Sequence, residues 1–309
     1  MQIFDKFKSS INQSIGVIDG HSIVIKREDL IHPIISGNKF RKLKYILEEV
    51  IDANIPIIIT YGGAFSNHLA ATATAAKSLG IKTLGIVRGE EWKNKISEST
   101  TLTFCQKEGM YLICIPRTIY AKKEASLEVQ QILENYPKYR LIPEGGTEAL
   151  ALKGCSEILE STDFDFDSVC CSVGTGGTFT GLIQSSSLKQ KVLGFNALNN
   201  PSVKDFILTQ TQKTNWEINS DYTFGGYAKT NTSLISFMNT FYQQYKIPLD
   251  PVYTGKMLFA IFDLIKTRQW KWGKQILVIH TGGLQGISGI NRQLQKKNTL
   301  LLSYEKEFF

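Results

Sequence analysis

The sequence predicts an α/β fold with parallel sheets, and three observations support this prediction. Short apolar runs alternate with segments of helical spacing along most of the 309-residue chain. The runs are continuously apolar, as expected of strands buried on both faces of a parallel sheet. Glycine-rich turns follow three of the runs, at 62–68, 174–178 and 280–283, where a strand would pass into the next element.

Local spacing and capping residues predict the individual elements. The helix expected over 39–50 carries its apolar residues on one face. The helix after the strand 55–61 begins at Ser66 or Asn67, which are good N-cap residues, and ends near Gly80. The remaining strands are expected at 22–25, 81–87, 110–115, 169–173, 191–195 and 275–280, and the remaining helices at 97–107, 121–135, 147–160, 177–187, 230–245 and 254–268.

A chain of this length is long enough for two domains, although no Pro-, Gly- or Ser-rich linker separates them. We place the boundaries near residues 40 and 154. Residues 1–40 and 155–309 then form a larger domain, and residues 41–154 form a smaller domain inserted into it. This division predicts a functional site in the cleft between the domains.

Composition argues against several classes of protein. The formal charge of +7 is spread among acidic residues, so a nucleic-acid surface is not expected, although a basic surface would attract anionic substrates. Five cysteines without a C-x-x-C pair indicate reduced thiols, and no metal site is expected. No apolar run approaches the roughly 18 residues of a membrane helix, and residues 1–10 lack the apolar core of a signal peptide, so we expect a cytoplasmic protein.

The loop Gly174-Thr175-Gly176-Gly177-Thr178 comes directly after the apolar run 169–173. Glycines allow consecutive backbone N–H groups to turn toward one anion, and the following helix adds the positive end of its dipole. The loop lacks the Lys-Ser or Lys-Thr of a P-loop and the spacing of a dinucleotide fingerprint. It is therefore either a phosphate cradle or a tight turn between a strand and a helix.

Lys39 lies just after Gly37-Asn38, at the start of the first predicted helix. The positive end of a helix favours the neutral amine of a nearby lysine, and the neutral amine is the form that makes a Schiff base. Lys42 and Lys44, further along the same helix, are interpreted as surface charges.

Polar residues also gather at a second helix start, Ser66-Asn67-His68, where they can present a hydroxyl, an amide and backbone donors to a carboxylate. An ordinary N-cap explains Ser66 or Asn67 equally well, but it does not explain the double glycine before them. Thr254 is a plausible N-cap, and Tyr253 beside it could equally be a core aromatic residue.

Together these segments resemble the fold-type II pyridoxal phosphate enzymes, and more narrowly the branch containing D-cysteine desulfhydrase and 1-aminocyclopropane-1-carboxylate deaminase. The matching segments occur in the family's order across most of the chain. They are Lys26-Arg27-Glu28-Asp29, Gly37-Asn38-Lys39, Gly62-Gly63 with Ser66-Asn67-His68, Pro143-Glu144-Gly145-Gly146, the 174–178 loop, 250–256 and His280-Thr281-Gly282-Gly283. The resemblance implies a tryptophan synthase β-like fold of two open parallel sheets flanked by helices, a homodimer, and an active site in the interdomain cleft.

The resemblance also implies how the cofactor, pyridoxal 5′-phosphate, is held. Lys39 would bond it covalently and would later take the α-proton of the substrate as general base. The loop formed by Gly174, Thr175, Gly176, Gly177 and Thr178 would bind the phosphate. Asn67 would face the ring hydroxyl, and Thr254 would face the ring nitrogen.

For the substrate, the resemblance places Ser66 and His68 near its carboxylate, with Asn67 and Thr281 also in contact with it. Tyr253 and Tyr227 match active-site tyrosines of the family. The chain departs from the usual family pattern at a few positions near these residues, and the departures bear on the choice of substrate. They are Phe65 in place of glutamine, Leu69-Ala70 in place of Thr-Arg, and Ala228-Lys229-Thr230 in place of Gly-Leu-Pro.

The expected function is a lyase that converts D-cysteine to pyruvate, sulfide and ammonia. Family deaminases tend to carry glutamate at the Thr254 position and leucine at the Thr281 position, whereas this chain has threonine at both. Within the family, the alternative is opening of the ring of 1-aminocyclopropane-1-carboxylate to give 2-oxobutyrate and ammonia. Two further functions also fit the resemblance: a racemase or dehydratase on the same fold, and a non-catalytic pyridoxal phosphate-binding protein.

Overall fold

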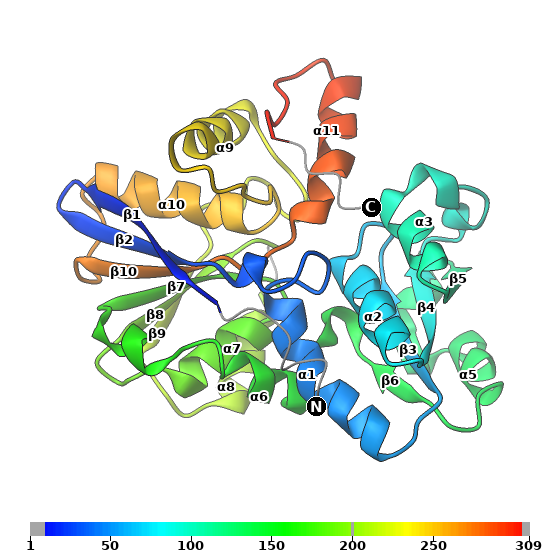
Figure 1. The fold of residues 1–309 in the computed structure, drawn as a ribbon. Coiled ribbons are helices and arrows are strands. Elements are labelled where there is room, and N and C mark those ends of the chain that lie inside the picture. The colour runs from blue at the N-terminus through cyan, green and yellow to red at the C-terminus, as the bar shows by residue number, and fades with distance from the viewer. Residues whose placement is uncertain (1–9, 199–200, 305–309) are drawn as a thin grey trace.

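A computed structural model describes residues 10–198 and 201–304 of the chain. Residues 1–9, most of the 1–10 segment in which no signal peptide is expected, lie outside the described residues. The strands form two separate sheets, with strand orders β1-β2-β10-β7-β8-β9 and β5-β4-β3-β6 (Figure 1). The strands are β1 (Asn12–Ile18), β2 (His21–Lys26), β3 (Ile57–Gly62), β4 (Lys82–Arg88), β5 (Met110–Ile115), β6 (Arg140–Ile142), β7 (Ser168–Val173), β8 (Lys191–Asn196), β9 (Trp216–Asn219) and β10 (Gln275–Ile279).

Strand pairing confirms the α/β class, with one difference at a sheet edge. All the pairings are parallel except that of β1 with β2, which is antiparallel and contains a bulge between Ser14 and Gly16. The sequence did not predict β1, β6 or β9. β1 exposes or half-exposes every residue, and β6 and β9 are only three and four residues long, so none of them has the apolar run of a buried strand.

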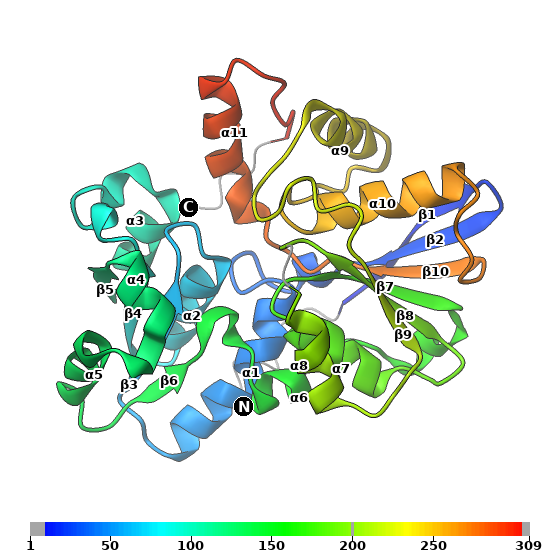
Figure 2. The ribbon, with the colours of Figure 1, turned by 180° about the vertical axis from the view of Figure 1, so that it is seen from behind.

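Helices cover both faces of each sheet (Figures 1 and 2). In the larger sheet, Cys170 faces the core formed with α9 and α10, whereas Cys171 faces the core formed with α7 and α8, as strand alternation requires. In the smaller sheet, α4 and α5 cover one face, and α2 and α3 the other. The helices are α1 (Asn38–Asp52), α2 (Asn67–Ser78), α3 (Thr100–Lys107), α4 (Arg117–Lys122), α5 (Leu127–Glu134), α6 (Ala149–Cys155), α7 (Gly177–Ser185), α8 (Val203–Gln210), α9 (Thr232–Tyr245), α10 (Thr254–Lys266) and α11 (Ile287–Lys296).

Several helices differ from the prediction. The single helix expected over 121–135 is two helices, because Lys123 adopts a left-handed backbone with φ of 51° and Ser126 caps a new helix. The helix expected over 147–160 is the shorter α6. Helices α8 and α11 were not predicted. No helix within residues 10–198 or 201–304 has the length and apolar character needed to cross a membrane.

Helix α1 lies between the two sheets and packs with α6 (Figure 1). Its apolar face joins the core that includes Ile58 of the smaller sheet and Ala71 of α2. On the other side, Gly154 of α6 approaches the backbone of Arg41 so closely that a Cβ added at Gly154 would lie 1.9 Å from the Arg41 carbonyl oxygen. The predicted domain boundaries fall within these two helices, and the division of the chain into two domains remains a prediction.

Gly154→Ala should therefore destabilise the protein. The added methyl group collides with backbone, which cannot rotate away as a side chain can, so we expect a loss of at least about 2 kcal/mol in the free energy of unfolding. Denaturant unfolding measures the loss. Gly286→Ala is the matched control, because a Cβ added at Gly286 would have no atom within 4 Å. Equal stability of the two variants would contradict the close contact between α1 and α6.

Candidate active site

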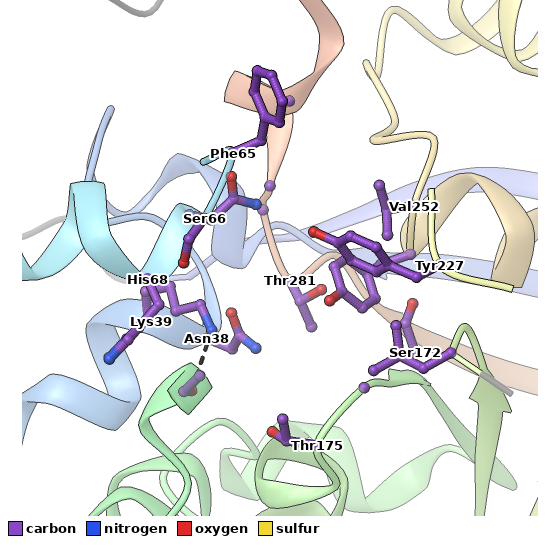
Figure 3. Close-up of a pocket in the computed structure, with 18 of the residues that line it drawn as sticks. Asn38, Lys39, Phe65, Ser66, His68, Ser172, Thr175, Tyr227, Val252 and Thr281 are labelled. Atoms are coloured by element: carbon purple, nitrogen blue, oxygen red, sulfur yellow. Dashed lines mark hydrogen bonds between the residues drawn. The ribbon is translucent and has the colours of Figure 1, made fainter. Parts of the chain in front are cut away.

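A cavity of about 590 Å³ lies where the turns that follow β3, β7 and β10 meet the start of α1. All the predicted site residues line it except Thr254. In Figure 3, Lys39 and His68 lie on the opposite side from Tyr227, and Thr175 lies at the end away from Phe65. The cavity therefore brings together the lysine, the glycine loop and the polar helix start that sequence analysis considered separately.

The loop after β7 exposes bare backbone to the cavity. Gly176 has φ of 90°, in the left-handed region that favours glycine, and is the residue before the first turn of α7. A Cβ added at Gly177 would lie 2.9 Å from Thr147 and 3.3 Å from the Nζ atom of Lys42. The first N–H groups of a helix have no intrahelical partner, so this turn offers donors and positive potential to an anion.

Two lysines of α1, one turn apart, enter the cavity. Lys39 donates from Nζ to the Gly145 carbonyl oxygen at 3.3 Å. Lys42 donates to the same oxygen at 2.8 Å and to the Thr147 hydroxyl at 2.8 Å, and its Nζ lies 3.5 Å from the Thr175 hydroxyl in the glycine loop. The interpretation of Lys42 as a surface charge is wrong, because the residue is only 2% exposed.

Burial and the neighbouring Lys42 charge lower the pKa of Lys39 to about 7. Burial also lowers the pKa of Lys42. A large fraction of Lys39 is therefore neutral near pH 7. Lys44 behaves as predicted for a lysine outside the site, since it is partly exposed and pairs with Glu157 at 2.6 Å.

The start of α2 forms another part of the wall. Ser66 is its N-cap, and the Ser66 hydroxyl accepts a hydrogen bond from the Leu69 backbone at 3.3 Å, which leaves the hydroxyl proton for a ligand. Asn67 lies against the turn at Gly283, and its Oδ1 atom is buried without a hydrogen-bond partner among the described residues. Both residues are placed to hold an anionic or polar ligand.

His68 differs from the expectation that it faces a carboxylate. The Thr60 hydroxyl donates to the Ile142 carbonyl oxygen at 2.9 Å, so it accepts from Nε2 of His68 at 2.9 Å. Burial, followed by the charges of Lys39 and Lys42, holds the pKa of His68 well below its usual range. The ring is therefore neutral, and its Nδ1 atom is an acceptor without a hydrogen to donate to a carboxylate.

The two predicted threonines have different environments. Thr281 lines the cavity, whereas Thr254 is fully buried outside its lining. The Thr254 hydroxyl donates to the Asp250 carboxylate at 2.7 Å and accepts from the Asp250 backbone at 2.9 Å. The expectation that Thr254 faces a ring nitrogen in the cavity does not match this geometry. Tyr253 packs against Gly174, where an added Cβ would lie 3.2 Å from its ring.

Sequence analysis assigned no role in the site to Asn38 or Lys42. Asn38 donates to the Thr178 hydroxyl at 2.9 Å and so ties the start of α1 to the glycine loop. Lys42 could have been found, because residues three apart on a helix share a face and Lys39 was already assigned to the site.

These features fit pyridoxal phosphate. The bare loop can take its phosphate, the neutral amine of Lys39 can bond its aldehyde, and two buried atoms in the cavity wall, Asn67 Oδ1 and His68 Nδ1, lack partners that a bound molecule would supply. Within the described residues, no group of three or more His, Cys, Asp or Glu side chains could hold a metal ion.

Comparison with known proteins agrees with this fit. Residues 13–282 match the family of pyridoxal-phosphate dependent enzymes, and the chain belongs to that family. It is 30% identical over 290 residues to a putative 1-aminocyclopropane-1-carboxylate deaminase of Pyrococcus horikoshii, covering 86% of each chain. It is 28% identical to a D-cysteine desulfhydrase of Klebsiella pneumoniae, covering 85% of this chain and 87% of that protein.

A solved structure of a 1-aminocyclopropane-1-carboxylate deaminase homologue superposes with a TM-score of 0.81 at 25% identity, over 96% of this chain and 98% of that one. A serine racemase from Dictyostelium discoideum superposes with a TM-score of 0.65 at 17% identity, over 91% and 94% of the two chains, and shares the fold. The fold-type II class and the pyridoxal phosphate cofactor are thereby confirmed.

The depressed pKa of Lys39 predicts how the cofactor-free protein captures pyridoxal, which lacks the phosphate. Only the neutral amine attacks an aldehyde, so the rate should rise with pH and level off above about 7. In Lys42→Gln the neighbouring positive charge is gone, and the midpoint should move to higher pH. Borohydride trapping and peptide mapping follow the reaction. Label on a lysine other than Lys39 would contradict the assignment.

The position of Lys42 beside the glycine loop predicts a phosphate-specific loss of affinity. At a pH above the capture midpoints of both proteins, Lys42→Gln should weaken binding of pyridoxal phosphate by about tenfold or more, because a charge-assisted contact contributes roughly 1.5–3 kcal/mol, while binding of pyridoxal changes little. Equilibrium dialysis of both compounds gives the two affinities. Lys44→Gln is the control and should leave both unchanged. An equal loss for both compounds would show that Lys42 supports the fold rather than the phosphate.

Proposed function

We propose that this protein is a pyridoxal phosphate-dependent lyase that eliminates the β-substituent and the amino group of a small amino acid. The proposed substrate is D-cysteine, which with one water gives pyruvate, sulfide and ammonia. The observation that supports this most directly is the position of Lys39. Its amine has a pKa of about 7 and enters the same cavity as the glycine loop and the start of α2.

In this proposal the chain positions the reactants and moves one proton. The loop 174–178 and Lys42 bind the phosphate, and bound pyridoxal phosphate supplies the electron sink. Ser66 and Asn67, at the positive end of α2, bind the substrate carboxylate. The Nζ atom of Lys39 takes the α-proton, for which an amine with a pKa near the working pH is well suited.

The scarcity of acidic residues in the cavity wall helps to choose between the two substrates. Glu144 is the one acidic residue among the described residues that line it, and Glu144 pairs with Lys123 at 2.8 Å. A carboxylate beside the ring nitrogen would favour a protonated ring and a stronger electron sink. Because Glu144 is already paired, the described part of the cavity wall offers the ring no free carboxylate, which suits elimination of a good leaving group such as sulfide better than opening of a cyclopropane ring. Thr281 in the wall also agrees with the desulfhydrase pattern.

The relatives carry names of both activities, so 1-aminocyclopropane-1-carboxylate is the alternative substrate. A bifunctional enzyme of Arabidopsis thaliana, 29% identical over 88% of this chain and 75% of that protein, is named for both. Assembly as a homodimer and location in the cytoplasm remain predictions.

A side-by-side assay decides between the two substrates. At equal enzyme concentration, we expect sulfide and pyruvate from D-cysteine and little or no 2-oxobutyrate from the cyclopropane acid. Lys39→Ala should remove nearly all turnover, because the proton acceptor is lost, whereas Lys44→Ala should keep it. Faster turnover of the cyclopropane acid would overturn the choice of D-cysteine. Turnover by Lys39→Ala at the wild-type rate would overturn the mechanism.

A further inference from the structure

One charged residue of the cavity has no part in the chemistry described so far. Arg88 is the last residue of β4, and β4 pairs in parallel with β3 so that Val87 lies opposite Gly62. The end of β4 therefore lies beside the turn that leads to Ser66. A Cβ added at Gly63 would lie 3.4 Å from the Nη2 atom of Arg88, so the guanidinium lies over this turn, and Arg88 lines the cavity.

Arg88 is half-buried but has no anionic partner. In the described part of the chain, no hydrogen bond or ion pair joins its guanidinium to another residue, and the guanidinium carbon lies 5.8 Å from the centroid of the Tyr120 ring. The other arginines that are not exposed all meet carboxylates: Arg27 with Asp29, Arg41 with Glu28, and Arg140 with Glu49 and Glu148.

The nearest acidic residue of the wall does not satisfy Arg88. Glu144 also lines the cavity, but its carboxylate pairs with Lys123, whose ammonium lies 3.3 Å from the centroid of the Tyr120 ring. Burial raises the pKa of Tyr227, and the Arg88 charge opposes that rise, so Arg88 lies within electrostatic reach of the Tyr227 hydroxyl. Because the guanidinium lies over the turn that leads to Phe65 and Ser66, Arg88 is at the end of the cavity away from Thr175 of the phosphate loop.

We infer that Arg88 forms a second anion subsite, which binds an acidic group on the side chain of the substrate. This inference rests on the proposed lyase function, in which Ser66 and Asn67 already take the α-carboxylate. A planar guanidinium with free N–H groups matches a carboxylate in two parallel hydrogen bonds, and a half-buried site strengthens such a contact. The preferred substrates are then β-substituted amino acids whose leaving group carries a carboxylate.

Two nearly isosteric substrates test the subsite. S-carboxymethyl-D-cysteine and S-carbamoylmethyl-D-cysteine differ by one negative charge. In each, the bond between the β-carbon and sulfur breaks, the sulfur leaves as a thiol with one proton, and water releases pyruvate and ammonia. The wild-type holoenzyme should show a kcat/KM for the carboxylate compound on the order of tenfold to hundredfold above that for the amide. Equal values for the two compounds would overturn the inference.

Variants of Arg88 test whether this residue causes the preference for the carboxylate compound over the amide. Arg88→Gln should remove the preference by lowering kcat/KM for the carboxylate compound alone, and Arg88→Lys should retain part of it. Arg268→Gln, at an exposed arginine outside the cavity, should keep the wild-type ratio. An equal loss for both compounds in Arg88→Gln would show that Arg88 acts on the α-carboxylate or on the fold, and would overturn the inference.

Calorimetry separates this inference from the proposed function. The Lys39→Ala holoprotein should bind the carboxylate compound more tightly than the amide, and Arg88→Gln in that background should abolish the difference. If D-cysteine is not turned over, the proposed lyase function is wrong. The difference in binding between the two compounds still shows whether Arg88 forms the subsite. Equal binding of the two compounds would overturn the subsite even if D-cysteine is a substrate.

Discussion

Two ammonium groups that approach one carbonyl oxygen are the constraint on which the site depends. Lys39 and Lys42 lie one helical turn apart and both reach the carbonyl oxygen of Gly145, which cannot neutralise two positive charges. The arrangement is tolerable when Lys39 gives up its proton or when an anion enters beside Lys42. Burial, together with this repulsion, makes Lys39 a nucleophile, and the same repulsion prepares Lys42 to receive a phosphate.

Several polar atoms around these lysines face the cavity and have no partner within the described part of the protein. Asn67 and His68 each keep one buried atom without a partner, and Arg88 keeps a guanidinium without a carboxylate. Buried polar groups are normally paired in a folded protein, so the unpaired atoms of Asn67 and His68 in the cavity wall are places where a ligand can make contact.

Local sequence patterns predicted most of the fold, whereas the family resemblance supplied the roles of most residues proposed for the site. The alternation of strands and helices, the three glycine turns and an N-cap at Ser66 or Asn67 follow from neighbouring residues alone. The break at Lys123 could not be predicted in this way, because Glu144, from a distant part of the chain, pairs with that side chain. The hydrogen bonds of Thr254, the burial of Lys42 and the open guanidinium of Arg88 likewise depend on tertiary contacts, which no single window of sequence contains.

The first residues of α1 have a consequence for the position of Lys39. Gly37 fits against the Thr281 carbonyl oxygen, where a Cβ would lie only 2.0 Å away, and Asn38 donates a backbone hydrogen bond to the same oxygen at 3.3 Å. The body of α1 packs with the smaller sheet on one side and with α6 on the other, where Gly154 meets the Arg41 backbone. Lys39 therefore lies on a helix that is held at its start by the turn after β10 and along its length by both neighbours. A side chain added at Gly37 or Gly154 would shift the amine that holds the cofactor, although neither residue lines the cavity.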